Sequence, residues 1–242
     1  MRSLLFHGVL TAVVIIIGML SPLIALLPEK PQSRFIGGCV SSIIRALRIC
    51  CGLRYRVHGM DNLHCGQQDH CIVMAKHTST WETLFFQYLL RSPVWVLKRE
   101  LLAIPFFGWI VAMLKPIAID RSAGKQALDS IIRQSRSRLS ATRPLVIFPE
   151  GTRSTAGQQA HYKLGGAVVA RKIGATVIPV AHNAGWFWPS GGLRIYPGTV
   201  HVVIGKPIPG PHHHSAQLMA EVESWIEHTV AALPRRNQGT NR

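Results

Sequence analysis

The amino-terminal run from Leu4 to Leu27 constrains the fold most, because His7 is its only ionisable side chain. An apolar run of this length can cross the hydrocarbon core of a bilayer as a tilted helix. Pro22 and Pro28 complicate this helix, since proline removes a backbone donor and clashes with the preceding turn, so the chain either kinks or turns back within the interface. We therefore expect a membrane-associated helical segment that spans the bilayer or lies in one leaflet.

The flanks of this run predict its retention and its orientation. The run is longer than the hydrophobic region of a usual signal peptide, and no small-x-small cleavage motif follows it, which favours retention over cleavage. Arg2 alone precedes the run, whereas Lys30, Arg34 and Arg45 follow it. By the positive-inside rule, the rest of the chain is expected on the cytoplasmic side of the membrane.

A second stretch, from Arg34 to Leu53, combines an apolar face with Arg45 and Arg48. This pattern is typical of a helix that lies on an anionic membrane surface. We expect residues 1–52 to form a membrane-anchoring helical segment, residues 53–233 to form the main domain and residues 234–242 to form a frayed polar tail.

Charge and cysteine content limit the partners and the compartment. The chain has 27 Lys and Arg against 11 Asp and Glu, a net charge of +16, so polyanions and anionic surfaces are natural partners. The cations are scattered through apolar elements, with no basic run interleaved with aromatics, no zinc-finger spacing and no RNA-recognition strand signature. This disfavours nucleic acid as a partner. The five cysteines include no C-x-x-C pair, which favours a reducing compartment.

Downstream of residue 52, short β-rich runs alternate with helical patterns. The predicted strands are Leu53–Val57, Cys71–Ala75, Val94–Leu97, Pro116–Ile119, Leu145–Phe148, Thr176–Ala181 and Thr199–Ile204. The predicted helices are Gln126–Leu139, His161–Ile173 and Ala216–Leu233. This alternation predicts an α/β fold with a mixed, largely parallel sheet flanked by helices. Ligands of such sheets bind where strands end and loops begin.

One predicted strand runs into "MAKHTSTWE", which holds His77 and Glu82. On one continuous helix these residues would lie about 140° apart, too far round for easy contact. Ser79 and Glu82 form the S-x-x-E pattern of a capping box, which begins the helix at Ser79 and leaves His77 in the preceding turn. The Glu82 carboxylate then either orients the imidazole for proton transfer or bonds back to the Ser79 amide, and the fragment alone favours the capping role.

A second predicted strand runs into "PEGTRS", a loop that contains Glu150, Gly151, Thr152 and Arg153. An acid, a flexible glycine, hydroxyls and an arginine together suit the binding of a phosphate and a neighbouring hydroxyl. The alternative is a surface turn with a salt bridge between Glu150 and Arg153. Arg121 in "AIDRS" follows another predicted strand and is a second phosphate-binding candidate, or else it belongs to a solvated helix start capped by Ser122.

Four blocks follow one another along the chain: "KHTSTWE" from Lys76, "KRELLAIPFFGWIVAMLKPIAIDRS" from Lys98, "VIFPEGTRS" from Val146 and "ATVIPVAHNAG" from Ala175. In this order the chain resembles the glycerolipid acyltransferase family, in particular its bacterial 1-acyl-sn-glycerol-3-phosphate acyltransferases. The resemblance covers about Arg56 to Lys206, and four ordered blocks are much more specific than one. The first block of the family usually ends in aspartate, where this chain has Glu82. The carboxylate is kept, so we expect activity to survive the change.

The resemblance implies a role for each matching position. His77 is similar to the general base of the family and Glu82 to its orienting partner. The positions similar to those that bind the phosphate and glycerol of the acceptor are Arg121, Glu150, Gly151, Thr152 and Arg153. Pro179 shapes the site from the fourth block. The resemblance implies no metal and no other cofactor.

The implied reaction moves an acyl group from acyl-CoA or acyl carrier protein to the sn-2 hydroxyl of 1-acyl-sn-glycerol-3-phosphate, which gives phosphatidic acid. Residues 53–233 are then the acyltransferase domain. The implied partners are the lipid acceptor, the acyl donor and the membrane surface, and the implied location is the bacterial inner membrane with the catalytic domain facing the cytoplasm. Two alternatives remain open. The acceptor is another lyso-lipid, such as lyso-ornithine lipid or a lysophospholipid, or the chain is a non-catalytic basic protein that binds membranes.

Overall fold

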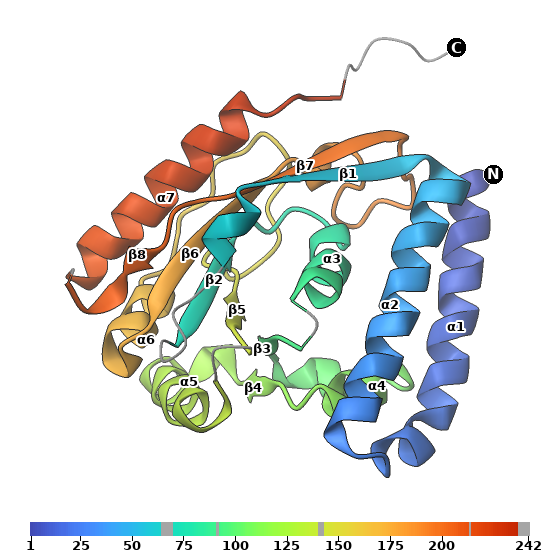
Figure 1. The fold of residues 1–242 in the computed structure, drawn as a ribbon, viewed down its shortest axis with the longest axis horizontal. Helices are drawn as coiled ribbons and strands as arrows, with labels where there is room; N and C mark the ends of the chain where they lie inside the picture. The colour runs from blue at the N-terminus through green and yellow to red at the C-terminus, as the bar shows by residue number, and fades with distance from the viewer. Residues whose placement is uncertain (64–69, 91, 140–142, 213, 237–242) are drawn as a thin grey trace.

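The computed structural model describes residues 1–63, 70–90, 92–139, 143–212 and 214–236, without the side chains of Arg121 and His212. Within these residues, helices cover both faces of one eight-stranded sheet (Figure 1). The strands are β1 Leu53–His58, β2 Cys71–Ala75, β3 Val94–Lys98, β4 Ile117–Ile119, β5 Leu145–Ile147, β6 Thr176–His182, β7 Gly198–Ile204 and β8 Ile208–Pro209. The α-helices are α1 Arg2–Ala25, α2 Glu29–Cys51, α3 Trp81–Leu89, α4 Phe107–Met113, α5 Lys125–Arg138, α6 Gly165–Ile173 and α7 Ser215–Ala232.

The sheet is mixed and largely parallel, which confirms the predicted fold class. Its strand order is β1-β7-β6-β2-β5-β3-β4, with β8 paired to β6. Only the pairs that β6 makes with β7 and with β8 are antiparallel within the described residues. Because β6, β2, β5, β3 and β4 run parallel to one another, their carboxyl ends share one edge of the sheet. The loops after β2, β5 and β4 therefore begin at the same edge.

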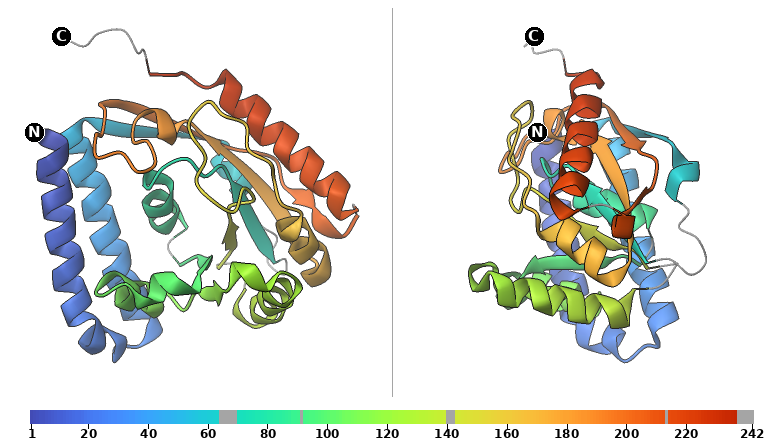
Figure 2. Two further views of the ribbon diagram at one scale, coloured as in Figure 1. Left: turned by 180° about the vertical axis from the view of Figure 1, so that it is seen from behind. Right: turned by 90° about the vertical axis from the view of Figure 1, so that its left-hand side faces the viewer.

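Strand β2 separates two apolar cores. Cys71, Val73 and Ala75 face a core built with α1, α2 and α3, whereas Ile72 and Met74 face a core built with α5, α6 and α7. Side chains of a strand alternate between the faces of its sheet. A parallel strand that is covered on both faces reads as a continuous apolar run, which explains why all residues of β2 are buried. The two helical layers are seen from further directions in Figure 2.

The amino-terminal segment folds as an antiparallel hairpin of α1 and α2 that lies against the domain (Figure 1). Helix α1 continues through Pro22, so the expected reversal occurs after Ala25 and not at the proline. Pro28 stands at the N-cap of α2, and Gly52 ends α2 in the left-handed conformation at φ 67°, which glycine adopts without steric cost. Within the described residues, α1 is the one helix long and apolar enough to cross a membrane.

Two further expectations differ from the structure. Helix α6 begins at Gly165 instead of His161, because the Lys163 N–H donates to the Pro149 carbonyl at 2.9 Å and not to a helical turn. The beginning of the predicted frayed tail is anchored: Asn183 donates to the Pro234 carbonyl at 2.7 Å, and the Arg236 guanidinium lies 3.5 Å from the centre of the Tyr196 ring. Cys39, Cys50 and Cys51 are free thiols. Cys71 is disulfide-bonded.

Candidate active site

His77 and Glu82 meet at the carboxyl end of β2. The Nδ1 atom of His77 lies 2.9 Å from Oε1 of Glu82, and the same oxygen accepts the backbone N–H groups of Thr78 and Ser79 at 2.9 and 2.8 Å. The Ser79 hydroxyl in turn accepts the N–H of Trp81 at 3.0 Å. One carboxylate therefore accepts the Ser79 N–H, as in a capping box, and also contacts the imidazole, so the two roles that the sequence presented as alternatives occur together. Helix α3 itself begins at Trp81, with Thr80 at its N-cap, one residue after the predicted cap.

The Glu82 carboxyl is fully buried and ionised. Burial alone raises its pKa, but the hydrogen bonds from His77 and from the Ser79 N–H outweigh burial and hold the pKa of Glu82 below its usual range. An ionised carboxylate only accepts hydrogen bonds. Nδ1 of His77 must therefore carry its proton toward Glu82, which leaves the lone pair of the neutral ring on Nε2.

The His77 ring is held in a fixed plane. It stacks on Phe148 with ring centroids 3.9 Å apart and an interplanar angle of 10°. Phe148 also contacts Phe86 and Trp95, so an aromatic wall adjoins the imidazole. The His77 side chain keeps 15% of its surface exposed, whereas Glu82 keeps none. The arrangement fixes the tautomer and orientation of a base while leaving it partly accessible, which is what transfer of a proton from a bound alcohol requires.

The loop after β5 is fastened to the backbone of His77. Oε1 of Glu150 accepts the His77 N–H at 3.0 Å, and the N–H of Ser154 donates to the His77 carbonyl at 2.8 Å. Gly151 turns the loop at φ 75°, a conformation that favours glycine. Glu150 is thus buried against the protein and forms its ion pair with Lys76, so the alternative of a Glu150–Arg153 salt bridge is wrong.

The remaining predicted acceptor residues lie around this loop. Thr152 and Arg153 are exposed. Arg121 begins a short 3-10 helix directly after β4, at the shared strand edge, but its side chain lies outside the described part of the chain. That helix is capped by Asp120, which accepts the N–H and the hydroxyl of Ser122 at 2.9 and 2.6 Å. The N-cap is therefore Asp120, two residues before the predicted cap at Ser122.

Pro179 does not lie beside the dyad. It pairs with Met74 within the sheet and borders a groove with Gly205 and Trp225 on the far side of β6. The fourth block instead contributes His182, whose Nε2 donates to the Lys76 carbonyl at 2.7 Å and whose Nδ1 accepts the Ala184 N–H at 3.3 Å. Burial lowers the pKa of His182, so this ring is a neutral support of the strand end.

Sequence reasoning missed a group of polar residues behind the dyad. The group consists of Lys76, Tyr162, His182 and Glu227, and three of them border a cavity of about 200 Å³ next to Thr78. Lys76 and His182 stand within two of the four blocks, which was the available signal, whereas nothing in the sequence linked Glu227 to them. Within the described residues, no cluster of three or more His, Cys, Asp or Glu could hold a metal ion.

Comparisons with known proteins agree with this geometry. The family model described as Acyltransferase matches residues 54–183. The chain is 41% identical over 238 residues, 96% of this chain and 91% of the relative, to the 1-acyl-sn-glycerol-3-phosphate acyltransferase of Pseudomonas aeruginosa. It is 29% identical over 140 residues to the enzyme of the same name from Helicobacter pylori, which covers 56% of this chain and 59% of that relative.

A solved structure shares the fold. The crystal structure of the 1-acyl-sn-glycerophosphate (LPA) acyltransferase from Thermotoga maritima superposes with a TM-score of 0.78 at 22% sequence identity, over 97% of both chains. At this identity the likeness concerns the fold, including the amino-terminal helices. The family match and the Pseudomonas relative also remove the support for a non-catalytic membrane-binding protein. The chain belongs to the acyltransferase family and is an acyl-transferring enzyme.

Proposed function

We propose that this enzyme transfers an acyl group from a thioester to the sn-2 hydroxyl of 1-acyl-sn-glycerol-3-phosphate and so makes phosphatidic acid. The observation that supports this proposal most directly is the 2.9 Å contact between His77 and Glu82 at the carboxyl edge of the sheet. It occurs in a chain that is 41% identical to a relative of that name. The donor is acyl-CoA or acyl carrier protein, and both deliver the same thioester bond.

The geometry supports general-base catalysis. Nε2 of His77 takes the proton of the acceptor hydroxyl as that oxygen attacks the thioester carbonyl. Glu82, bonded to Nδ1, stabilises the imidazolium that forms. When the tetrahedral intermediate collapses, the carbon–sulfur bond breaks and the imidazolium returns its proton to the leaving thiolate. The step gives an ester and a free thiol, and it needs no redox cofactor and no covalent acyl-enzyme.

Arginines at the shared strand edge suit an acceptor that carries a phosphate. Arg153 is exposed on the loop that is bonded to His77, and Arg121 follows β4 at the same edge. A guanidinium binds a phosphomonoester through paired, charge-assisted hydrogen bonds. We therefore place the phosphate of the acceptor at Arg153 and Arg121, with Gly151 and Thr152 beside its glycerol. The buried Glu150 supports the loop and does not reach the lipid.

The hairpin suits attachment to one leaflet better than a span. Near the start of α1, the Ser3 hydroxyl donates to the Ile195 carbonyl at 3.2 Å and His7 lies 3.0 Å from the Leu193 carbonyl. Near its end, Gly18 lies so close to Phe106 that a Cβ there would come within 2.5 Å of the Phe106 Cβ. A helix that crossed the bilayer would give up one of these contacts. The exposed apolar side chains of α1 include Leu4, Leu5, Val9, Ile16, Met19, Leu20 and Leu23.

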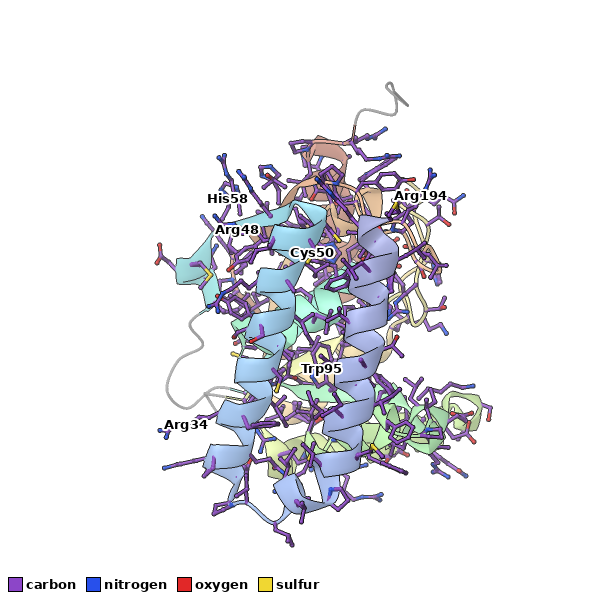
Figure 3. The ribbon with its side chains drawn as sticks, turned by 90° about the vertical axis from the view of Figure 1, so that its right-hand side faces the viewer. Arg34, Arg48, Cys50, His58, Trp95 and Arg194 are labelled. Atoms are coloured by element: carbon purple, nitrogen blue, oxygen red, sulfur yellow. The ribbon has the colours of Figure 1, made fainter. Side chains whose placement is uncertain are left out.

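Helix α2 adds positive charge beside this apolar surface. Arg34 and Arg48 project from the same side of α2 in Figure 3, and Arg45 and Arg54 border the same groove as Arg48. No acidic residue occurs between Lys30 and Met60. Each arginine near an anionic surface contributes about 1 kcal/mol of attraction. We propose that the hairpin lies in the cytoplasmic leaflet of the bacterial inner membrane with the active site facing the cytoplasm.

A thiol-release assay with the purified full-length enzyme in vesicles tests the function. Each of two donors, acyl-CoA and acyl carrier protein, is paired with 1-acyl-sn-glycerol-3-phosphate, a lysophospholipid diester and lyso-ornithine lipid. We expect the phosphomonoester to give the highest kcat/KM with at least one donor. A higher value for lyso-ornithine lipid or for the diester would reassign the acceptor.

A further inference from the structure

A lysine immediately before the base is buried and held from several directions. The Lys76 side chain is 2% exposed, and its ammonium lies 2.6 Å from Oε1 of Glu227 and 3.5 Å from Oε1 of Glu150. A third acceptor, the Gln158 carbonyl, lies at 3.4 Å. Burial of an ammonium is costly unless carboxylates and further acceptors surround it. Lys76 meets that condition through groups from two distant parts of the chain.

The two carboxylates belong to segments that are remote in sequence. Glu150 lies on the loop after β5, and Glu227 lies on α7 near the carboxyl end of the chain. Tyr162, on the same loop as Glu150, donates its hydroxyl to Oε1 of Glu227 at 2.8 Å. Figure 2 shows this long loop crossing from the sheet toward α7. Lys76 and Tyr162 thus join the loop and α7 through one carboxylate oxygen of Glu227.

The same network reaches the base through its backbone. Oε1 of Glu150, which faces Lys76, also accepts the N–H of His77 at 3.0 Å. The N–H of Lys76 donates to the Val180 carbonyl at 3.2 Å, and the Lys76 carbonyl accepts from His182 at 2.7 Å. The backbone around the Lys76–His77 peptide is therefore held at three atoms, which are the nitrogen and oxygen of Lys76 and the nitrogen of His77. A shift of the Glu150 carboxylate would release the hydrogen bond of the His77 N–H.

We propose that Lys76 and Glu227 are positioning residues, which hold Glu150 against the His77 amide and make helix α7 part of the catalytic apparatus. The inference rests on the proposed role of His77 as the base, and neither residue contacts the reacting atoms. The ion pair fixes the place of the Glu150 carboxylate. Glu150 in turn fixes the peptide from which the imidazole reaches the acceptor hydroxyl. A misplacement of about 1 Å at such a point lowers turnover on the order of 100-fold.

The charges around His77 give this role a signature in the pH profile. The groups that face the strand end are Glu82 from α3, Glu150 from the loop after β5, His182 from β6 and Glu227 from α7, together with Lys76 itself. Removal of the Lys76 charge favours the protonated base, so the acid limb of the kcat/KM profile moves to higher pH. Removal of the Glu227 charge moves it to lower pH. Each shift is expected to be on the order of one pH unit at an effective dielectric constant near 20.

The experiment compares Lys76→Met, Glu227→Gln and the double variant with the wild-type enzyme, using the acyl acceptor that the wild type turns over fastest. We expect kcat to fall about 100-fold in Lys76→Met and about tenfold in Glu227→Gln, with KM within roughly twofold of wild type. The double variant should resemble Lys76→Met, because residues that act as one unit are not additive. Glu223→Gln, one turn away on α7, removes the same charge and serves as the matched control.

The outcomes separate this inference from the proposed function. If the wild-type enzyme is inactive with every lyso-lipid, that result contradicts the proposed function and not the role of Lys76 and Glu227. If the wild type is active, unchanged kcat in Glu227→Gln overturns the inference, as does an equal loss in Glu223→Gln or a pH shift of the same sign in both single variants. If Lys76→Met does not fold, the nearly isosteric Glu227→Gln still tests the inference. Glu227 is 17% exposed, so its replacement by an amide of the same size is compatible with folding.

Discussion

The two halves of the candidate site differ in how completely the protein holds them. The turn from β2 into α3 is buried, and one oxygen of Glu82 is bonded to His77, Thr78 and Ser79. In the loop after β5, Glu150 is bonded inward, whereas Thr152 and Arg153 face solvent. The buried half fixes the base before substrate arrives. The exposed half has positive charge available for an anionic ligand. Substitutions in the two halves should therefore alter different kinetic constants.

In the buried half, replacement of Glu82 by Gln is expected to lower kcat about 100-fold while KM changes little. The amide keeps the size of the side chain but removes the charge that stabilises the imidazolium and fixes its tautomer. Glu82→Asp keeps the charge and should retain at least about a tenth of the rate. Steady-state acyl transfer by the three proteins measures both effects. Equal rates would reduce Glu82 to its capping role.

In the exposed half, Arg153→Gln is expected to raise KM for 1-acyl-sn-glycerol-3-phosphate about tenfold with a smaller effect on kcat. The lost charge-assisted hydrogen bond is worth about 1.5 kcal/mol or more. Arg133→Gln, at an exposed position on α5, removes the same charge elsewhere and is the control. A loss confined to kcat would contradict this prediction and would indicate that Arg153 acts on the chemical step, as His77 does.

The hairpin of α1 and α2, which we propose attaches the enzyme to the membrane, extends the comparison to a surface outside the candidate site. Arg48→Gln should weaken binding of the enzyme to anionic vesicles about fivefold, since one arginine contributes about 1 kcal/mol there. Binding to neutral vesicles and kcat in detergent should stay within roughly twofold. Co-sedimentation at two salt concentrations measures this, and the difference should shrink at high salt. Equal loss on neutral vesicles would point to a folding defect instead.

The smallest expected effect concerns stability against acid. The pKa of Glu82 is lower in the folded enzyme than the ordinary glutamate value of 4.5. Its stabilising contribution is therefore fully present above that value and is lost as the pH falls through the lower, folded-state pKa. Thermal unfolding between pH 6 and pH 3 should show a loss of stability on acidification that Glu82→Gln lacks. Parallel curves for the two proteins would contradict this.

The comparison also shows what could be predicted from the sequence. The strands and the bond from Glu82 to the Ser79 amide followed from local patterns, because apolar runs and the capping box act over a few residues. The pairing of His77 with Glu82 was only one of two local alternatives, and the family resemblance favoured it. The partners of Lys76 did not follow, since Glu227 is distant in sequence and reaches Lys76 only after α7 packs on β6. The inward orientation of Glu150 depended on the same tertiary contact. Local patterns together with the family resemblance thus predicted the dyad, whereas nothing local predicted the residues that support it.

The account depends most directly on His77 as the base. We would measure transfer of a labelled acyl group to 1-acyl-sn-glycerol-3-phosphate by His77→Ala and wild type in the same vesicles, together with vesicle binding and thermal unfolding of both. We predict a rate loss of about 1,000-fold or more, whereas vesicle binding and thermal unfolding should stay as in the wild type. A folded, membrane-bound His77→Ala enzyme that keeps more than about a tenth of the wild-type rate would contradict it.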